Sequence, residues 1–411
     1  MNWSLLRLPA FRALWLGRLF SWVGSGIGPV ALAFAALDLG ADAVQLGLVV
    51  AARSLPNLLL ILFGGVLADR LPKRLIAVGS SVVSALSLAV GALLLAGGLG
   101  TLPLLAVLGA LNGVGAAYFS PSTSALLREL VGDQLIRDAT VLNRVSMNIG
   151  LIVGTAIGGA LVAAFSSQIA LAVGSLLFTS ALVAFAGLPR NAIGAVRGGS
   201  FARDLLEGLA FVLRTRWLLS TLILSFLAQF VFAGAVQVLG PIAARETFGP
   251  ALWGFAGAVQ TLGLVVGAVV AGSLRGRLRL AVATTGTMAM ALPLGVLALI
   301  LLVEPLGVDP LHWFFWLSLA LFAASVGLEI FTIPLDVTVQ LQVPRSYLAR
   351  VYASLTLASL AGMPLGEIVV GPVARLVGSS ATLVGMAVLI VAASAVVGLS
   401  RRVRNADAAL G

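Results

Sequence analysis

Long apolar segments alternate with short polar segments along the whole chain of 411 residues. Each apolar segment has about 20 residues or more, the length that an α-helix needs to cross the hydrocarbon core of a bilayer. Backbone N–H and C=O groups in hydrocarbon must bond within their own segment, so we expect helices here. The twelve predicted membrane-spanning segments are 11–37, 44–67, 75–97, 102–127, 139–165, 168–188, 217–243, 251–274, 280–303, 312–337, 350–375 and 379–399.

The longest polar segment, 189–216, divides these helices into two sets of six. Its glycine-rich first part predicts a flexible linker. Its second part, 201–214, has apolar residues at helical spacing opposite its charges, which predicts an amphipathic helix on the membrane surface. We therefore expect an all-α polytopic membrane protein with an N-terminal six-helix bundle over 1–188. A cytoplasmic linker follows over 189–216, and a C-terminal six-helix bundle with a short basic tail covers 217–411.

The basic residues gather in alternate polar segments. Nineteen of the 25 Lys and Arg residues lie in 1–10, 68–74, 128–138, 189–216, 275–279, 338–350 and 400–411. Positive charge marks the cytoplasmic side of membrane proteins, so both termini are predicted to be cytoplasmic in a protein of the cell membrane. The net charge of +10 then reflects topology and contact with anionic lipid rather than nucleic-acid binding.

Several classes of chemistry are disfavoured. The chain has no cysteine and one histidine, His312, so disulfides, thiolate chemistry and a histidine-based metal cluster are not expected, and neither is a cofactor. No Gly-x4-Gly-Lys-Ser/Thr loop for nucleotide phosphates occurs. The acidic residues are scattered rather than paired, which argues against a membrane-embedded enzyme. Arg7 and Arg12 precede an apolar stretch too long for a cleavable signal peptide, so the first helix should remain as an anchor.

The two halves contain matching positions. Phe119 matches Phe331 in the fourth and tenth segments, and with the same offset Gly154 matches Gly366 in the fifth and eleventh. Two related halves predict a transporter with its substrate site near the bilayer midplane and alternating access by rocking of one half.

Three stretches resemble the major facilitator superfamily. The segment Gly65-Val66-Leu67-Ala68-Asp69-Arg70-Leu71-Pro72-Lys73-Arg74 resembles its signature loop between helices two and three. Residues 11–20 and 119–127 are similar to the branch that includes the enterobactin exporter, macrolide-efflux proteins and tetracycline/aminoglycoside multidrug efflux pumps. The resemblance implies a twelve-helix fold, alternating access and proton-driven export.

The chain departs from that pattern at three places. Pro72 stands where the signature loop usually has Gly, and helix four lacks the Arg of many drug antiporters, with Asn112 as its notable polar group. The fifth helix reads Gly154-Thr155-Ala156-Ile157-Gly158-Gly159, with Thr in place of the usual Pro. Gly154, Gly158 and Gly159 still allow close helix packing.

The signature loop supplies a candidate conformational latch. The resemblance places Asp69 at the inner end of helix two, beside Arg350 at the start of helix eleven. A carboxylate is stabilised by the exposed N–H groups of a helix N-terminus. Arg70 and Arg74 would reach helix carbonyls or lipid phosphates. The alternative is that these charges only set the topology.

Charged residues inside the spans carry a cost of at least ~2.5–3.5 kcal/mol near the bilayer centre, so each needs a partner or a function. Glu329 lies in helix ten, which lines the cavity of the implied fold. Desolvation there favours the protonated acid near neutral pH. We expect Glu329 to carry the coupling proton and, when deprotonated, to bind a cationic substrate or Arg18 of helix one. A permanent ion pair with Arg18 is the alternative.

Arg53 in helix two and Glu367 in helix eleven both fall in the outer half of the membrane. In the implied fold these helices face each other, so we predict an Arg53–Glu367 pair that closes the outer side. Alternatively, Arg53 contacts an anionic substrate, or each residue has its own polar neighbour.

Aromatic and polar residues on the central helices form a candidate substrate pocket suited to bulky amphiphiles. They are Phe34, Asn112, Tyr118, Phe119, Phe226, Gln229, Phe230 and Gln237. The leading hypothesis is a monomeric, proton-coupled exporter of drugs, antibiotics or siderophores. The alternative is an uptake symporter or facilitator for a small metabolite, although the spans hold few of the Asn and Gln residues that sugar recognition uses.

Overall fold

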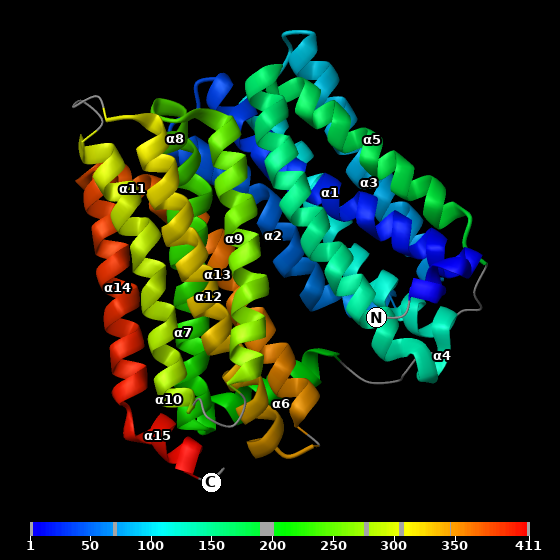
Figure 1. The fold of residues 1–411 in the computed structure, drawn as a ribbon. Coiled ribbons are helices and arrows are strands. Elements are labelled where there is room, and N and C mark those ends of the chain that lie inside the picture. Colours follow the sequence, from blue (N-terminus) through cyan, green and yellow to red (C-terminus); the bar gives the residue numbers. More distant parts are fainter. Residues whose placement is uncertain are drawn as a thin grey trace. The chain divides into compact units, whose positions relative to one another are not determined.

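The computed structural model describes residues 3–68, 72–189, 201–274, 279–303, 308–345 and 347–408. Twelve helical stretches of the described chain are long and apolar enough to span a membrane, which confirms the predicted fold class. The elements (Figure 1) are η1 (Trp3–Arg7), α1 (Pro9–Asp38), α2 (Ala43–Ala68), α3 (Lys73–Ala96), α4 (Leu102–Ala164), α5 (Ser167–Ala186), α6 (Phe201–Arg214), α7 (Arg216–Phe232), η2 (Ala233–Leu239), α8 (Gly240–Glu246), α9 (Gly249–Ser273), α10 (Leu280–Ala283), η3 (Thr284–Met290), α11 (Ala291–Val303), α12 (Pro310–Gln342), α13 (Leu348–Val377), α14 (Ser379–Leu399) and α15 (Arg401–Ala408).

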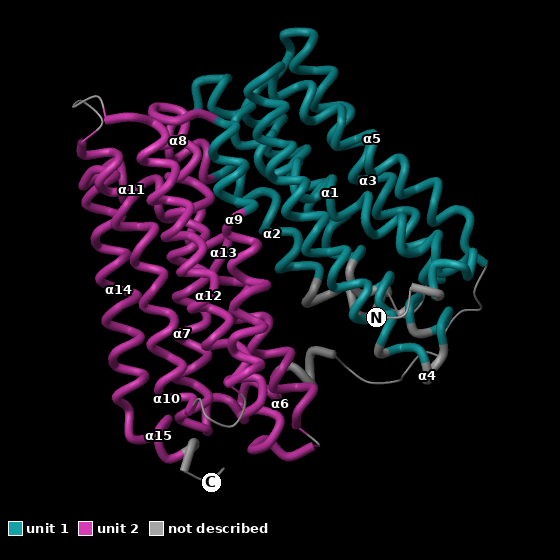
Figure 2. The backbone as a smooth tube through the Cα atoms, in the orientation of Figure 1, with its two compact units in different colours: residues 1–41, 48–198, 250–258 teal, residues 42–47, 199–249, 259–411 magenta. Residues whose placement is uncertain are grey.

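The chain forms two compact units (Figure 2). Unit 1 comprises residues 1–41, 48–198 and 250–258. Unit 2 comprises residues 42–47, 199–249 and 259–411. The beginning of α2 therefore belongs to unit 2, and a part of α9 near its beginning belongs to unit 1.

In unit 1, α1 is packed against α4 and α5, and α3 packs on the same two helices. One apolar cluster surrounds Phe11, Phe119 and Phe185, and a second surrounds Ile27 and Phe178. Small residues set these helix spacings: a Cβ atom at Gly17 would lie 2.4 Å from the ring of Phe185. In unit 2, α13 packs mainly on α7, and α14 packs on α11.

The outward faces of both units are apolar. Leu93 of α3 is 72% exposed, and Leu376 of α13 is 83% exposed. Large exposed apolar side chains on most of the long helices are costly in water and favourable in lipid. The surface is therefore that of a protein embedded in a membrane.

The segment 128–138, which we predicted as a loop, is helical. It lies inside α4, so this one element contains both the fourth and the fifth spans. Besides Gly132 and two aspartates, the segment contains leucine, glutamate, glutamine and arginine, and it has no proline. These residue types favour helix, which accounts for helical structure between two spans that hydropathy alone separates.

Two other spans change helix type inside the membrane. The seventh span has π-helical turns at Ala233–Leu239 between α7 and α8. The ninth has 3₁₀ turns at Thr284–Met290, where the Thr287 hydroxyl donates to the Thr284 carbonyl over 2.7 Å. π-Turns are rare and occur frequently at functional sites. Neither feature has a hydropathy signal.

A polar cap begins α2. The Gln45 backbone N–H donates to Oδ1 of Asp42 over 2.9 Å, and the Asp42 N–H donates to Oε1 of Gln45 over 3.1 Å. This reciprocal arrangement is a capping box. Arg375 of α13 adds an ion pair with Asp42 inside unit 2.

Asp42→Asn tests this cap. The Gln45 N–H and then Arg375 hold the pKa of the Asp42 carboxyl below its ordinary value of 3.8. A depressed folded-state pKa means that the charge stabilises the fold at neutral pH, and that this contribution disappears as the pH falls below about 4. Asparagine can still cap but has no charge, and the pair is exposed. Thermal unfolding in detergent should show a midpoint lower by about one or two degrees at neutral pH.

The difference in unfolding midpoint between Asp42→Asn and the unaltered protein should disappear at acid pH. Arg375→Gln is the matched variant, because in its background the Asp42 substitution should have a smaller effect at neutral pH. A difference that persists unchanged into acid would contradict a contribution from the charge.

Candidate functional site

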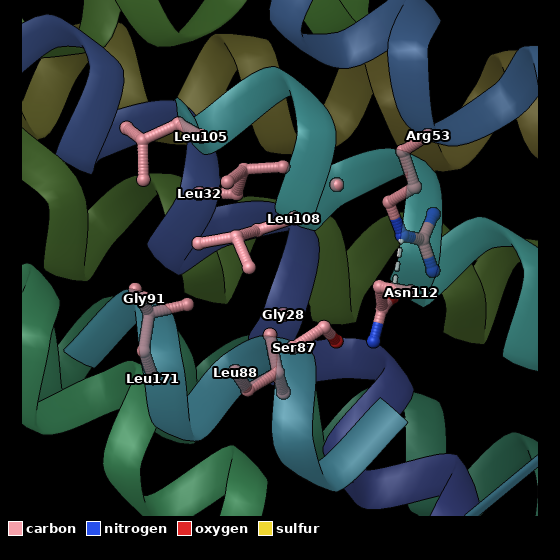
Figure 3. Close-up of a pocket in the computed structure, with 11 residues that line it drawn as sticks. Gly28, Leu32, Arg53, Ser87, Leu88, Gly91, Leu105, Leu108, Asn112 and Leu171 are labelled. Carbon is pink, nitrogen blue, oxygen red and sulfur yellow. Dashed lines mark hydrogen bonds between the residues drawn. The ribbon is translucent and has the colours of Figure 1, made fainter. Parts of the chain in front are cut away.

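Arg53 of α2 lies beside a small cavity inside unit 1 (Figure 3). Its Nε atom donates a hydrogen bond to Oδ1 of Asn112 in α4, over 3.1 Å. The space admits the centre of a water-sized sphere over about 10 Å³, roughly what one water molecule requires. The other lining residues are Gly28, Leu32, Ser87, Leu88, Gly91, Leu105, Leu108, Gly109 and Leu171. The predicted gate residue Arg53 thus meets the predicted substrate-binding residue Asn112.

A second space in unit 1, which we call the serine cavity, is also lined by Asn112. Its lining residues are Trp22, Ser25, Ser80, Ser81, Ser84, Asn112, Gly115, Ala116, Phe119 and Phe178. Its volume of about 40 Å³ is above the minimum that a water molecule requires. The lining therefore combines serine hydroxyls and aromatic rings, and it includes two predicted substrate-binding residues, Asn112 and Phe119.

Arg18 is buried beside Phe119, which is one of the residues that line the serine cavity. Only 3% of its surface is exposed. Its guanidinium carbon lies 6.0 Å from the ring centroid of Phe119. The Trp22 and Phe119 rings meet edge to face, with centroids 5.4 Å apart. The Arg18 side chain is therefore buried inside unit 1 and does not reach the surface of the protein.

Glu329 is half-buried in α12 of unit 2. The Thr332 hydroxyl donates to its Oε2 over 3.2 Å. A Cβ atom at Gly267 of α9 would lie 2.9 Å from the Glu329 Cβ, so α9 approaches α12 closely at this point. The carboxyl group is held where two spans meet. Because Arg18 belongs to unit 1, its pairing with Glu329 stays a prediction.

The remaining pocket candidates are divided between the units. In α7, the rings of Phe226 and Phe230 stack with centroids 6.2 Å apart. Gln229 is half-buried in the same helix, and Gln237 is half-buried within the π-helical turns. In unit 1, Phe34 is 2% exposed and is packed in the interior, whereas Tyr118 is half-buried. Their contact with substrate stays a prediction.

The predicted latch is described only in part, because Asp69 and Arg70 lie outside the described residues. Arg74 donates to the carbonyls of Phe185 and Ala186 at the end of α5. A cation at the carbonyl end of a helix is favourable. Lys73 pairs with Glu129 of α4. Both contacts are inside unit 1, and a role in switching stays a prediction.

Arg350 anchors the amphipathic helix α6 to α13 in unit 2. Its Nη1 atom lies 2.8 Å from Oε2 of Glu207. A Cβ atom at Gly208 would lie 2.3 Å from the Arg350 carbonyl oxygen, and the rings of Phe211 and Tyr347 stack with centroids 4.9 Å apart. The bounds of α6 agree with the predicted 201–214.

The predicted outer gate joins residues of different units. Arg53 lies in unit 1, and Glu367, which is 1% exposed, lies in α13 of unit 2. A Cβ atom at Gly47 would lie 2.3 Å from the Glu367 carbonyl oxygen, so α13 and the start of α2 pack closely inside unit 2. The Arg53–Glu367 pair stays a prediction.

Three glycines predicted for helix packing lie at close contacts in unit 1. A Cβ atom at Gly154 would lie 2.3 Å from the Val23 carbonyl oxygen, and one at Gly158 would lie 3.0 Å from the Ile27 Cα. At Gly159 it would lie 2.4 Å from the Pro250 carbonyl oxygen. Backbone meets backbone at each position. The contacts at Gly154 and Gly159 leave no room for a Cβ atom, and the contact at Gly158 is tight.

Sequence reasoning missed the serine cavity. A signal was present, because Ser80 and Ser84 of α3, which both line the cavity, are four residues apart and share one face of that helix. Trp22 and Phe178 have no comparable signal, since aromatic residues are frequent throughout the spans. Glu207 was identified only as part of a polar helix face, and Thr332 was not identified.

Comparison with known proteins agrees with the architecture. The family model described as "Transmembrane secretion effector" matches residues 1–410. The chain is 26% identical to the uncharacterized MFS-type transporter YfiS of Bacillus subtilis, over 82% of this chain and 81% of that protein. It is 27% identical to the multidrug efflux pump Tap of Mycobacterium tuberculosis, over 94% and 91%. It is 28% identical to the enterobactin exporter EntS of Salmonella typhimurium, over 90% and 87%.

Solved structures share the fold at low sequence identity. The nucleoside transporter NupG superposes with a TM-score of 0.73 at 15% identity, over 96% of this chain and 98% of that one. A bacterial homologue of the human lysosomal transporter Spinster gives 0.71 at 14% identity, over 99% of both chains. The named relatives are transporters, which are not enzymes.

Proposed function

Because the chain belongs to the transmembrane secretion effector family of the major facilitator superfamily, we propose that it exports amphiphilic small molecules in exchange for protons. Drugs, antibiotics or siderophores are the expected substrates. The observation that carries the proposal is the match along nearly the whole length to proteins named as a multidrug efflux pump and an enterobactin exporter. By their names, one moves several drugs out of the cell and the other exports enterobactin.

The spans supply few groups that can carry a proton. Glu329 is a half-buried carboxyl group between α9 and α12, with the Thr332 hydroxyl as a hydrogen-bond donor. Carboxylates within membrane helices commonly mark proton relays. We propose that Glu329 exchanges a proton for substrate during alternating access, and that Arg53 and Glu367 close the outer side.

The distribution of charge favours a topology, and the proposed export is defined relative to that topology. Arginine and lysine concentrate in alternate polar segments, which favours cytoplasmic termini in the plasma membrane. Export then moves substrate from the side that carries both termini to the opposite side, and protons return inward.

Expression in cells that lack their own efflux pumps tests the function. A panel of antibiotics, dyes and siderophores should identify compounds whose accumulation falls when the protein is present, and a protonophore should restore it. A matched strain expressing Glu329→Gln is the control for nonspecific effects of expression. Accumulation that rises for a small polar metabolite, with no compound excluded, would instead favour the uptake alternative.

A further inference from the structure

Unit 1 contains six buried polar atoms that have no hydrogen-bond partner among the described residues. They are Nε1 of Trp15, Nε and Nη1 of Arg18, Oγ of Ser21, Nε1 of Trp22 and Nδ2 of Asn112. Indole, guanidinium and amide nitrogens can only donate, and a hydroxyl can also donate. The unit therefore has a surplus of buried donors. Buried polar groups are almost always paired, with protein, water or ligand, so these donors are open to water or to an electron-rich ligand.

Most of these donors belong to residues on one face of α1. Trp15, Arg18 and Trp22 follow one another at intervals of three and four residues, which puts them on one face of α1. That face meets α4 at Phe119, whose ring lies beneath the Arg18 guanidinium and against Trp22. Four of the six atoms, those of Trp15, Arg18 and Trp22, therefore lie along the same helix face.

The serine cavity begins beside this face, since Trp22 and Phe119 belong to its lining. Asn112, which carries another of the donors, also lines the cavity, and no aspartate or glutamate is among its described lining residues. Its volume of about 40 Å³ is above the minimum for a water molecule, so it has room for a small polar group. Phe119, Phe178 and Trp22 present aromatic surface around it.

Charge decides what kind of group would bind. A guanidinium removed from water carries a penalty of several kcal/mol unless a counterion offsets it, and no ion pair joins Arg18 to an acid among the described residues of unit 1. A neutral ligand would satisfy hydrogen bonds but would not offset the charge. An anionic oxygen ligand does both, because charge-assisted hydrogen bonds are about twice as strong as neutral ones.

We propose that Arg18, Trp22 and the serine cavity bind the anionic group, a carboxylate or a phenolate, of an aromatic substrate. The proposal rests on the proposed function and specifies its substrate class: amphiphilic compounds that carry an acidic group. Arg18 binds the anion, and the Trp22 and Phe119 rings contact the adjoining aromatic part. A free inorganic anion carries the same negative charge without the aromatic part, so the test compares an aromatic carboxylate with chloride.

Calorimetry on the purified full chain in detergent measures this binding without transport. Benzoate is the probe, and benzamide is its uncharged isostere. Benzoate should bind and quench tryptophan fluorescence, whereas benzamide should bind at least about tenfold more weakly, the difference expected for a lost charged hydrogen bond. Chloride should not displace benzoate at matched concentration.

Two variants locate the site. Arg18→Gln should weaken benzoate binding about tenfold or more. Arg144→Gln, which removes an exposed arginine from α4 of the same unit, should leave it unchanged. Unaltered protein that binds neither compound, binds both equally, or binds chloride as well as benzoate would overturn the proposal, whether or not Arg18→Gln folds. Failed export with intact benzoate binding would instead count against the proposed function alone.

Discussion

Replacing Glu329 with glutamine is expected to abolish proton-driven export. Glutamine keeps the shape of the side chain and can still accept the Thr332 hydrogen bond, which spans 3.2 Å. It cannot bind and release a proton. In vesicles that contain the purified protein, a pH gradient should therefore no longer concentrate substrate, and uphill transport should fall to the level of empty vesicles. Exchange of substrate down its own gradient should persist, because that step needs no net proton movement.

Asp336→Asn is the matched control for this variant. Asp336 lies in the same helix but is exposed, so its substitution removes an acid at low structural cost. We expect uphill transport close to that of the unaltered protein. If Glu329→Gln still drove substrate uphill, or if Asp336→Asn lost coupling instead, Glu329 would not be the proton-carrying residue.

Gly154→Val is expected to prevent assembly of the N-terminal bundle. The new Cβ atom would lie 2.3 Å from the Val23 carbonyl oxygen and 3.1 Å from the Gly26 Cα. Both neighbours are backbone atoms, which cannot rotate away as a side chain can. Overpacking commonly costs about 1–3 kcal/mol, and occasionally more. Size-exclusion chromatography and thermal unfolding should show aggregated or strongly destabilised protein.

Gly79→Val provides the comparison for that result. Gly79 lies in α3, also within a span, but a Cβ atom there would have no heavy atom within 4 Å. Both substitutions add the same side chain to a membrane helix, so a difference between them isolates the close contact. Equal stability of the two variants would contradict the close approach of α1 and α4 at Gly154.

The sequence predicted the elements that depend on length and hydropathy. Bilayer thickness sets a minimum length for each span. The amphipathic pattern of 201–214 predicted a helix there, although it did not predict that this helix packs on α13. Changes of helix type within an apolar span were not predictable, because they leave the hydropathy of the span unchanged. The π-helical turns at 233–239 and the 3₁₀ turns at 284–290 lie in spans whose apolar character continues through them. Helix in 128–138 was missed because polarity was interpreted as a loop.

The sequence identified the individual charged residues of the candidate site, but it did not predict which residues they contact. A charge inside a span is conspicuous, so Arg18, Arg53, Glu329 and Glu367 were all identified. Their neighbours were not, because contacts depend on how the helices pack. The hydrogen bond between Arg53 and Asn112, for example, joins residues 59 positions apart. The serine cavity depends on four helices, and no single stretch of sequence contains it.

Proton movement during substrate transport tests the central proposal most directly. Vesicles containing the purified protein and a trapped pH-sensitive dye would be loaded with a compound identified by accumulation in cells, then diluted into medium without it. Antiport predicts that substrate efflux drives protons into the vesicles, and that Glu329→Gln abolishes this acidification. Substrate efflux with no change of internal pH, or with protons leaving alongside it, would contradict a proton-coupled exporter.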